Sequence, residues 1–453
     1  MFIRKIAFTD AMREWTEEHG PLLTFWFGPT PTINICDYAT AVDAMVKKGS
    51  AFADRSLPYL FKLSRNGRGI MGSNGSQWLE QRRFALHTLR NFGIGRNLIE
   101  ERIMYEFEIA CEGLDKHLDT GENSIDPHNM FVLLVGNIIN RMLFTERFEQ
   151  HEEENFFALK KKLDDIMKNF RVFDMLINEW NVKWPLVKQR AKYLMKPMDS
   201  ILEFLGNQIE QRKREISNGS HVLRGEGEDF VDAFLLQMEK EKKSGAPTSF
   251  EEEALLMTLL DLWAAGQETT TLTINWAFSY LLMNPQVTSR VEEELLRVTG
   301  GRRPLSISDR PSTIYYNAVL TEIHRCAAIV HMNLSRDTSE DTVVGSYLIP
   351  KGTPIAAQIS LVMSDEKLFT NQQQFNPDRF LNGNKLDQMV VPFGLGKRAC
   401  PGESLAQAEL YLITANLLLR YKITADSLHM PSTKAHIGIM RRALPYRICF
   451  ERR

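Results

Sequence analysis

Cysteine is scarce and irregularly placed in this sequence. The 453 residues include five cysteines, at Cys36, Cys111, Cys326, Cys400 and Cys449. An odd number at uneven spacing does not make the paired framework that is typical of small secreted domains. We therefore expect no disulfide framework and a reducing compartment.

Long apolar runs and targeting signals are missing as well. Residues 1–15 contain no apolar run of signal-peptide length. Met130–Ile139 and Leu410–Leu419 are the most apolar stretches, but each is far shorter than the ~20 residues of a spanning helix. They also contain Asn137 and Asn416. The sequence therefore predicts no membrane-spanning segment.

Neither sign of charge is in marked excess. Lysine and arginine number 55 against 57 aspartates and glutamates, which gives a net charge of −2. The whole molecule thus has no electrostatic attraction to nucleic acid, and we expect no such partner. Glycine (27) and proline (18) make up about a tenth of the chain, which excludes collagen-like and low-complexity classes.

Helical periodicity dominates what the sequence does contain. Apolar residues recur at helical spacing in five long segments: Glu100–Asp119, Glu152–Lys168, Tyr193–Ile216, Glu251–Met283 and Pro285–Val298. Strand-like runs are fewer and shorter: Leu22–Phe27, Pro31–Cys36, Val343–Ile349 and Tyr446–Phe450.

Two polar stretches connect these segments. Asn218–Asp229 and Lys240–Ser249 have the composition of exposed connections, but both are short for linkers between domains. We therefore expect a mainly α fold, in one large domain over residues 1–453, with a small β-rich part contributed by both ends of the chain.

The helix expected over Glu251–Met283 has an unusual centre. Ser249 and Glu252 have the spacing of a capping box at its start, and Pro285 marks its end. The segment is apolar nearly all round, which is typical of a buried helix. Its middle nevertheless reads A-G-Q-E-T-T over 265–270, and buried polar groups are costly unless they are paired. These residues indicate either a functional site or a solvated stripe with a local kink.

The most specific signal is a glycine-rich segment around Cys400, F-G-L-G-K-R-A-C-P-G over 393–402. Glycines allow backbone to approach a large flat group. Helical periodicity resumes over Glu403–Arg420, so Cys400 precedes a helix N-terminus, where the dipole favours thiolate over thiol. No histidine or second cysteine follows at zinc spacing. A lone thiolate suits the axial position of a haem iron, and Arg398 can hydrogen-bond a haem propionate. The alternative is a buried structural cysteine.

These residues resemble the cytochrome P450 family. Its members hold haem through a cysteine thiolate, and the segment 393–400 fits the pattern F-x-x-G-x-R-x-C. Glu322 and Arg325 fit an E-x-x-R pair on one helix face. Arg379, within F-N-P-D-R-F, resembles a third member that joins them in a buried structural triad.

The resemblance extends from Phe52 to the C-terminus. Trp78 and Arg82 fit W-x-x-x-R, and Arg55 lies in a segment similar to one that contacts a propionate. Similarity to the animal microsomal enzymes that oxidise drugs and lipids is clearest in three segments: Phe84–Arg102, Tyr316–Val319 and Pro445–Phe450. The implied fold is a helical prism with a long central helix over the haem.

The resemblance implies a role for each matched residue. Thr269 would hold the proton network at the distal oxygen, Glu268 would connect it to water, and Gly266 would let the helix open locally. The implied residues that contact haem b are Cys400, Arg398, Trp78, Arg82, Arg55, Phe393, Gly394, Gly402 and Ala265, with Cys400 on the iron. Leu262, Val330, Ile437 and Ile439 would line an apolar substrate pocket.

Two features depart from the family pattern. His331-Met332 stands where related enzymes often have Pro-His, so the histidine is displaced by one residue and no propionate role is assigned to it. The chain also starts after the apolar anchor and the proline-rich hinge with which the membrane enzymes begin.

The implied activity is a monooxygenase that inserts one oxygen atom from O2 into an apolar molecule. Fatty acids, including polyunsaturated ones, and foreign compounds are the expected substrates. Electrons would come from NADPH through cytochrome P450 reductase, with cytochrome b5 as a second candidate donor. The alternatives are a haem-thiolate isomerase or dehydratase of lipid peroxides and a haem-binding protein without turnover, although Glu268 and Thr269 argue against both.

Two surfaces are expected to meet partners. A basic patch of Arg83, Arg90, Arg96 and Lys397 would attract an acidic reductase. The apolar loop 169–186, with Trp180 and Trp184, would dip into the cytosolic leaflet of the endoplasmic reticulum membrane; the alternative is that it only covers the pocket.

Overall fold

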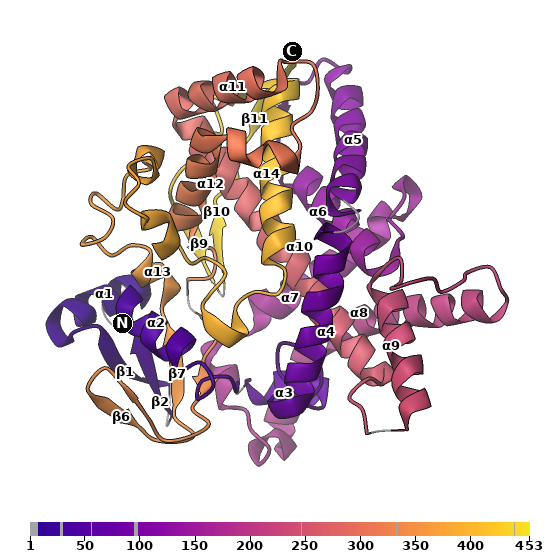
Figure 1. Cartoon of the computed structure of the whole chain (residues 1–453), viewed down its shortest axis with the longest axis vertical. Coiled ribbons are helices and arrows are strands. Elements are labelled where there is room, and N and C mark those ends of the chain that lie inside the picture. The colour runs from indigo at the N-terminus through magenta and orange to yellow at the C-terminus, as the bar shows by residue number, and fades with distance from the viewer. Residues whose placement is uncertain are drawn as a thin grey trace. The chain divides into compact units, whose positions relative to one another are not determined.

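The computed structural model describes residues 8–27, 30–55, 57–94, 98–245, 247–331, 333–438 and 440–453. Over these residues the protein is mainly helical with several small sheets, as the sequence predicts (Figure 1). The chain divides into two compact units. Unit 1 comprises residues 1–54, 107–131 and 269–453, and unit 2 comprises residues 55–106 and 132–268.

The helices follow the predicted periodicity closely. They are α1 (Phe8–His19), α2 (Tyr38–Val42), α3 (Tyr59–Arg65), α4 (Gly75–Ile94), α5 (Leu98–Leu118), α6 (His128–Phe144), α7 (Glu153–Asn169), α8 (Pro185–Ser217), α9 (Phe230–Ser244), α10 (Glu252–Met283), α11 (Pro285–Thr299), α12 (Ile314–Ala327), α13 (Ile359–Val362) and α14 (Glu403–Arg420).

The strands are short. They are β1 (Leu22–Phe27), β2 (Thr30–Ile35), β3 (Ser124–Ile125), β4 (Arg336–Asp337), β5 (Thr342–Val344), β6 (Tyr347–Ile349), β7 (Pro354–Ala357), β8 (Tyr421–Ala425), β9 (Ala435–Ile437), β10 (Arg441–Ala443) and β11 (Ile448–Arg452). The single strand expected over 343–349 is instead the hairpin β5–β6, because Gly345 adopts a positive φ of 59° between them.

Several helix starts differ from the prediction, most of all that of α8. α8 begins at Pro185 rather than Tyr193, since proline fits the first position of a helix. α10 begins at Glu252, and Ser249 does not cap it. The Ser249 hydroxyl donates instead to Glu80 of α4.

Unit 1 contains the sheets, and both ends of the chain build them. β1 and β2 pair antiparallel, β2 pairs parallel with β7, and β4 completes the order β1-β2-β7-β4. β11, near the C-terminus, lies between β3 and β8. The N-terminal strands and β7 are neighbours in Figure 1 although more than 300 residues separate them in sequence. Ile35, Met45, Phe52 and Ile355 form part of the apolar core under the first sheet.

Unit 2 is helical and rich in aromatic contacts. Phe84 of α4 makes edge-on ring contacts with Phe230 and Phe234 of α9, at centroid distances of 5.7 and 5.4 Å, and with Phe250 at 5.2 Å. The long helices α7 and α8 pack against one another in the same unit.

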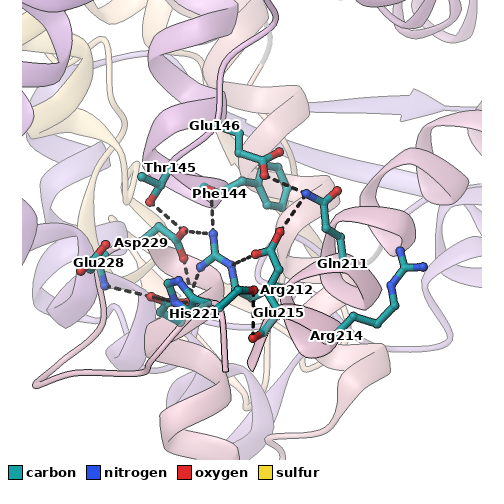
Figure 2. Close-up of polar contacts among 12 residues, drawn as sticks. Phe144, Thr145, Glu146, Gln211, Arg212, Arg214, Glu215, His221, Glu228 and Asp229 are labelled. Atoms are coloured by element: carbon teal, nitrogen blue, oxygen red, sulfur yellow. Dashed lines mark hydrogen bonds and ion pairs between the residues drawn. The ribbon is translucent and has the colours of Figure 1, made fainter. Parts of the chain in front are cut away.

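The connection 218–229 is mostly exposed, as its composition predicts, but its last residue is buried. Asp229 caps α9 and is fully buried, as is Asp232 in the first turn of that helix. Figure 2 shows Arg212 of α8 reaching into this cluster, where its guanidinium lies 2.9 Å from Asp229 and also bonds Asp232. His221 Nε2 lies 3.0 Å from Asp232. Burial raises the pKa of Asp229 in spite of Arg212. The end of this connection thus contains buried ion pairs that link α8 to α9.

The helices of the fold can be compared with the prediction that no segment spans a membrane. Within the described residues, no helix combines the length and the apolar character that crossing a bilayer requires.

Candidate functional site

The segment around Cys400 is a tight loop that leads into α14. The Cys400 N–H donates to the carbonyl of Phe393 at 2.8 Å, which closes the loop on itself. Gly396 adopts a φ of 70°, and a Cβ there would lie 1.7 Å from the Met45 carbonyl oxygen. Only glycine fits this position. Gly394, at a φ of 79°, has no such neighbour, so there the glycine serves the backbone conformation alone.

Cys400 is the exposed cysteine of the five. A Cβ on Gly402 would lie 4.0 Å from its Sγ, so the sulfur is close to the N-terminus of α14, where thiolate is favoured over thiol. Burial raises the pKa of Cys36 to about 11 and that of Cys111 and Cys326 to about 12, which keeps those thiols protonated.

Two arginines fix this loop within unit 1. Arg398 is buried, and its Nε donates to the Ala53 carbonyl at 2.6 Å. Arg336, which the sequence did not single out, donates to the Leu395 carbonyl at 2.6 Å. The loop is therefore held from β4 as well as from its own residues.

Two histidines lie on the segments that precede this loop. The ring of His324 makes an edge-on contact with Phe393, at a centroid distance of 5.2 Å, and burial lowers the pKa of His324 to about 4. His331 is buried, its Nδ1 has no hydrogen-bond partner among the described residues, and burial followed by the charge of Arg441 lowers its pKa. Both rings are therefore neutral near pH 7. Met332 lies outside the described residues.

The expected triad of Glu322, Arg325 and Arg379 is brought together in the interior of unit 1. Arg325 binds both carboxylate oxygens of Glu322, at 2.7 and 2.8 Å, and Arg379 Nε lies 3.2 Å from Oε1. The Asn376 N–H donates to the same oxygen at 2.9 Å. All three charged side chains are buried, so this cluster ties α12 to the segment that precedes the Cys400 loop.

In unit 2 a second basic cluster contains three expected haem contacts. The Arg82 guanidinium lies over the Trp78 ring, 5.8 Å from its centroid, and Trp78 is buried. Burial, and next the charge of Arg82, lower the pKa of Arg55 to about 10. Arg55 donates from one terminal nitrogen to the Met71 carbonyl at 3.2 Å, but its buried Nε has no partner among the described residues. These two guanidinium groups repel one another, and a negatively charged carboxylate ligand between them would offset the repulsion.

The centre of α10 presents one accessible face. Leu262, Ala265 and Thr269 are accessible and are three and four residues apart, while the intervening Trp263, Gln267 and Glu268 are buried. Ala265 is the most exposed of this stretch.

The expectation that Gly266 would open α10 locally is wrong. The helix is continuous through this glycine. Ile139 of α6 packs against it. A Cβ at Gly266 would lie 2.5 Å from Ile139 Cδ1. The glycine thus serves the approach of a neighbouring helix.

Glu268 does not reach toward solvent as expected. Its Oε2 lies 2.8 Å from the ammonium of Lys160 on α7, and Glu268 and Lys160 are both buried. Lys160 also binds Asp164 at 2.6 Å, one turn further along α7. No sequence signal pointed to Lys160, since 108 residues separate it from Glu268.

A second ion pair fixes the segment before α4. Arg65, at the end of α3, binds Asp261 of α10 at 3.0 Å, and the other carboxylate oxygen accepts from the Met71 N–H at 2.8 Å. Both charged side chains are buried. The segment 57–73 is therefore anchored to α10 one turn before Ala265.

The remaining pocket residues are only partly described. Val330 is half-buried in unit 1. The backbone of Ile437 lies in β9, but its side chain and the whole of Ile439 are outside the described residues.

The residues of both units have the chemistry that a haem requires. A cysteine sulfur at a helix N-terminus suits the iron, and buried arginines with a tryptophan suit propionates. Ala265 leaves room over a flat group. Each of these observations belongs to one unit.

Comparison with known proteins identifies a family of haem proteins. Residues 2–450 match the family model described as Cytochrome P450. The chain is 35% identical to a probable cytochrome P450, cyp-35D1, of Caenorhabditis elegans over 93% of this chain and 84% of that protein. It is 32% identical to rat cytochrome P450 2C23 over 97% of this chain and 88% of the relative. Identity to human cytochrome P450 2C8 is also 32%, over 96% and 88% of the two chains.

Proposed function

The chain belongs to the cytochrome P450 family and is therefore a monooxygenase that binds haem b, and on that premise we propose that Cys400 supplies the thiolate ligand of the iron. The observation that carries this proposal is the position of its sulfur beside the start of α14, in a loop closed at Phe393. The raised pKa values of Cys36, Cys111 and Cys326 support the same choice.

The propionates are assigned to the basic clusters. Arg55 and Arg82 would each pair with a carboxylate, with Trp78 donating from its indole nitrogen. Arg398 would contribute from the Cys400 loop. The mutual repulsion of Arg55 and Arg82 supports this assignment, because a bound anion relieves it. Phe393, Gly394, Gly402 and Ala265 would lie against the flat faces of the ring.

When bound, haem b supplies activation of O2, and the residues of α10 would handle protons around it. The Thr269 hydroxyl would accept and donate a hydrogen bond on the accessible face of the helix, next to Ala265. Glu268 would take part in proton transfer only after exchange of its bond to Lys160.

The substrate is proposed to be an apolar small molecule. Leu262 and Ala265 would lie on the substrate side, with Val330, Ile437 and Ile439 completing the pocket. Fatty acids, polyunsaturated ones among them, and foreign compounds fit this description equally. The names of the relatives give no substrate that would distinguish these two classes.

The electron donor is proposed to be NADPH–cytochrome P450 reductase, with cytochrome b5 as a second candidate. Arg83 and Arg90 are exposed on α4 and lie seven residues apart, on one face of that helix, where they suit an acidic partner. Lys397 is exposed in unit 1 and donates to the Ser50 hydroxyl at 2.8 Å. Arg96 lies outside the described residues.

Attachment to the cytosolic face of the endoplasmic reticulum is proposed through the segment between α7 and α8. Within it, two short 3-10 turns, Val172–Leu176 and Asn181–Lys183, present apolar side chains to solvent. The exposed ones are Phe173, Met175, Leu176, Trp180 and Trp184, followed by Leu186 in α8. Tryptophan suits the membrane interface.

One reconstitution experiment tests the activity. The holoenzyme is mixed with reductase, NADPH and a panel of fatty acids and drugs. Substrate-dependent NADPH consumption with an oxygenated product supports the monooxygenase. Rearrangement of a lipid peroxide without NADPH would instead support the isomerase alternative, and neither reaction would indicate a protein without turnover.

A further inference from the structure

The connection 218–229 contacts α4 before the chain enters α9. The side-chain amide of Asn91, in the last turn of α4, donates to the Glu226 carboxylate at 2.8 Å. Glu226 lies between Gly225 and Gly227, whose positive φ values of 55° and 91° turn the chain on either side of it. A Cβ at Gly227 would lie 2.6 Å from a backbone nitrogen of α9, so this turn requires glycine. A carboxylate is thereby held against the end of α4.

Buried side chains hold the residues that follow this carboxylate. Arg102 of α5 is buried and donates to the Glu228 carbonyl at 2.7 Å. Its guanidinium also lies 5.9 Å from the centroid of the Phe92 ring on α4. The next residue, Asp229, is held by Arg212 of α8, as Figure 2 shows. The end of the connection is therefore fixed to α5 and α8 by contacts within unit 2, close to the end of α4.

Asn91 belongs to the face of α4 that carries the basic residues proposed to meet an electron donor. His87 lies four residues after Arg83 and three before Arg90, and Asn91 lies four after His87, so these side chains share one side of the helix. Arg83, His87 and Arg90 are exposed. The Asn91 amide also lies 3.0 Å from His87 Nε2. Glu226 is therefore an internal carboxylate on a basic face.

We propose that Glu226 occupies part of the surface on α4 to which the carboxylates of an acidic partner protein bind, and that docking of this partner displaces Glu226. The partner would interact with Arg83 and Arg90 and take over the Asn91 amide. The charge of Glu226 has the same sign as the partner's and opposes docking while Glu226 remains in place. Its bond to Asn91 is exposed, and surface contacts of this kind cost little to open. Glu226 thus weakens the binding of acidic partners to α4.

The inference rests on the proposed donor face of α4, so its first test uses a probe that is not an electron donor. Binding of fluorescent poly-L-glutamate to the holoenzyme is measured by anisotropy at low salt. Glu226→Gln should bind the polymer several-fold more tightly than wild type, because the internal competitor is gone. Glu241→Gln is the matched control, since it removes the same charge from a carboxylate of α9 that also accepts from a side-chain amide. Equal affinities of the two variants would overturn the inference.

A double variant shows where the effect arises. Arg90→Gln should weaken binding of the polymer, because it removes a cation from the face of α4. Adding Glu226→Gln to Arg90→Gln should then raise the affinity less than Glu226→Gln does in wild type, because both residues act at one site. Additive effects of the two changes would show that Glu226 acts only through the net charge of the protein, which would contradict the inference.

Reduction of the haem by cytochrome P450 reductase separates this inference from the proposed donor. At low reductase concentration, Glu226→Gln should be reduced several-fold faster than wild type, and Glu241→Gln at the wild-type rate. A slower reduction of Arg90→Gln with an unchanged rate for Glu226→Gln would overturn the inference and leave the donor face in place. If Arg90→Gln does not change the rate while polymer binding responds as expected, the reductase docks elsewhere and the inference holds for another acidic partner.

Discussion

The ammonium of Lys160 lies 2.8 Å from the Glu268 carboxylate, and the two groups meet from α7 and α10 in the interior of unit 2. Asp164 accepts from the same ammonium at 2.6 Å. Lys160 thus has two carboxylate partners, so its bond to Glu268 can open without leaving a buried cation alone. Under the proposed mechanism, Glu268 would have to leave this pair before it could take part in proton delivery.

Removing Lys160 should destabilise the protein. Lys160→Met leaves Glu268 buried without its cation, and loss of one partner of a buried pair costs about 3 kcal/mol. The double variant Lys160→Met with Glu268→Gln should recover part of this loss. Thermal unfolding of the wild type, the two single variants and the double variant measures the effect. Lys243→Met, which breaks an exposed pair on α9, should leave Tm almost unchanged. Additive effects of the two buried changes would show that the groups are not coupled.

Thr269→Ala should separate electron flow from product formation. The variant should bind haem and CO normally but release several-fold more peroxide per NADPH, because the proton reaches the wrong oxygen. Thr273→Ala is the matched control, since it makes the same change one turn later, where the hydroxyl bonds the Thr269 carbonyl. Unchanged coupling in Thr269→Ala would remove this residue from proton delivery.

Glu409 should give stability a distinct pH dependence. Its pKa is raised to about 8 in the folded protein, so the stability linked to its proton is complete below the unfolded value of 4.5 and is lost as pH rises through about 8. The Tm of Glu409→Gln should therefore rise relative to wild type as the pH goes from about 5 to 8. A constant difference across this window would mean that the folded pKa is not raised.

The loop between α7 and α8 should bind membranes weakly. Arg190 binds both carboxylate oxygens of Asp174, at 2.9 and 2.7 Å, and so fixes the loop that carries Trp180 and Trp184. Partial flotation with anionic liposomes is expected at low salt, and Trp180→Glu with Trp184→Glu should reduce it. Leu428→Glu, at a more exposed apolar site in unit 1, should not. Absence of the wild type from the floated fraction would leave the loop as a cover for the pocket.

Local pattern predicted the elements of this fold well. Helical periodicity placed α10, α11 and α14 to within one residue, because their buried faces are continuous in sequence. α8 began eight residues before the prediction, since Pro185 starts a helix whose first turns carry few buried residues. Ser249 matched a capping box but bonds Glu80, a partner that local sequence cannot reveal.

The candidate site was predictable only in part, because local sequence does not reveal contacts between residues far apart in the chain. Glu322 and Arg325 are three residues apart, so their pairing follows from helix geometry. Lys160, Arg336 and Asp261 act through partners 59 to 196 residues away, and nothing in their local sequence marks them. Glu409 was passed over because an acid within an apolar helix looks like an ordinary polar interruption until its burial is known.

The identity of the iron ligand is the claim on which the rest depends, and the ferrous–CO spectrum tests it most directly. Cys400→Ser should abolish the strongly red-shifted absorption that a thiolate-ligated haem shows with CO. Serine at Cys36, Cys111, Cys326 or Cys449 should leave that absorption in place. Retention of the red-shifted band in Cys400→Ser, or its loss in one of the other four variants with intact fold, would contradict the account.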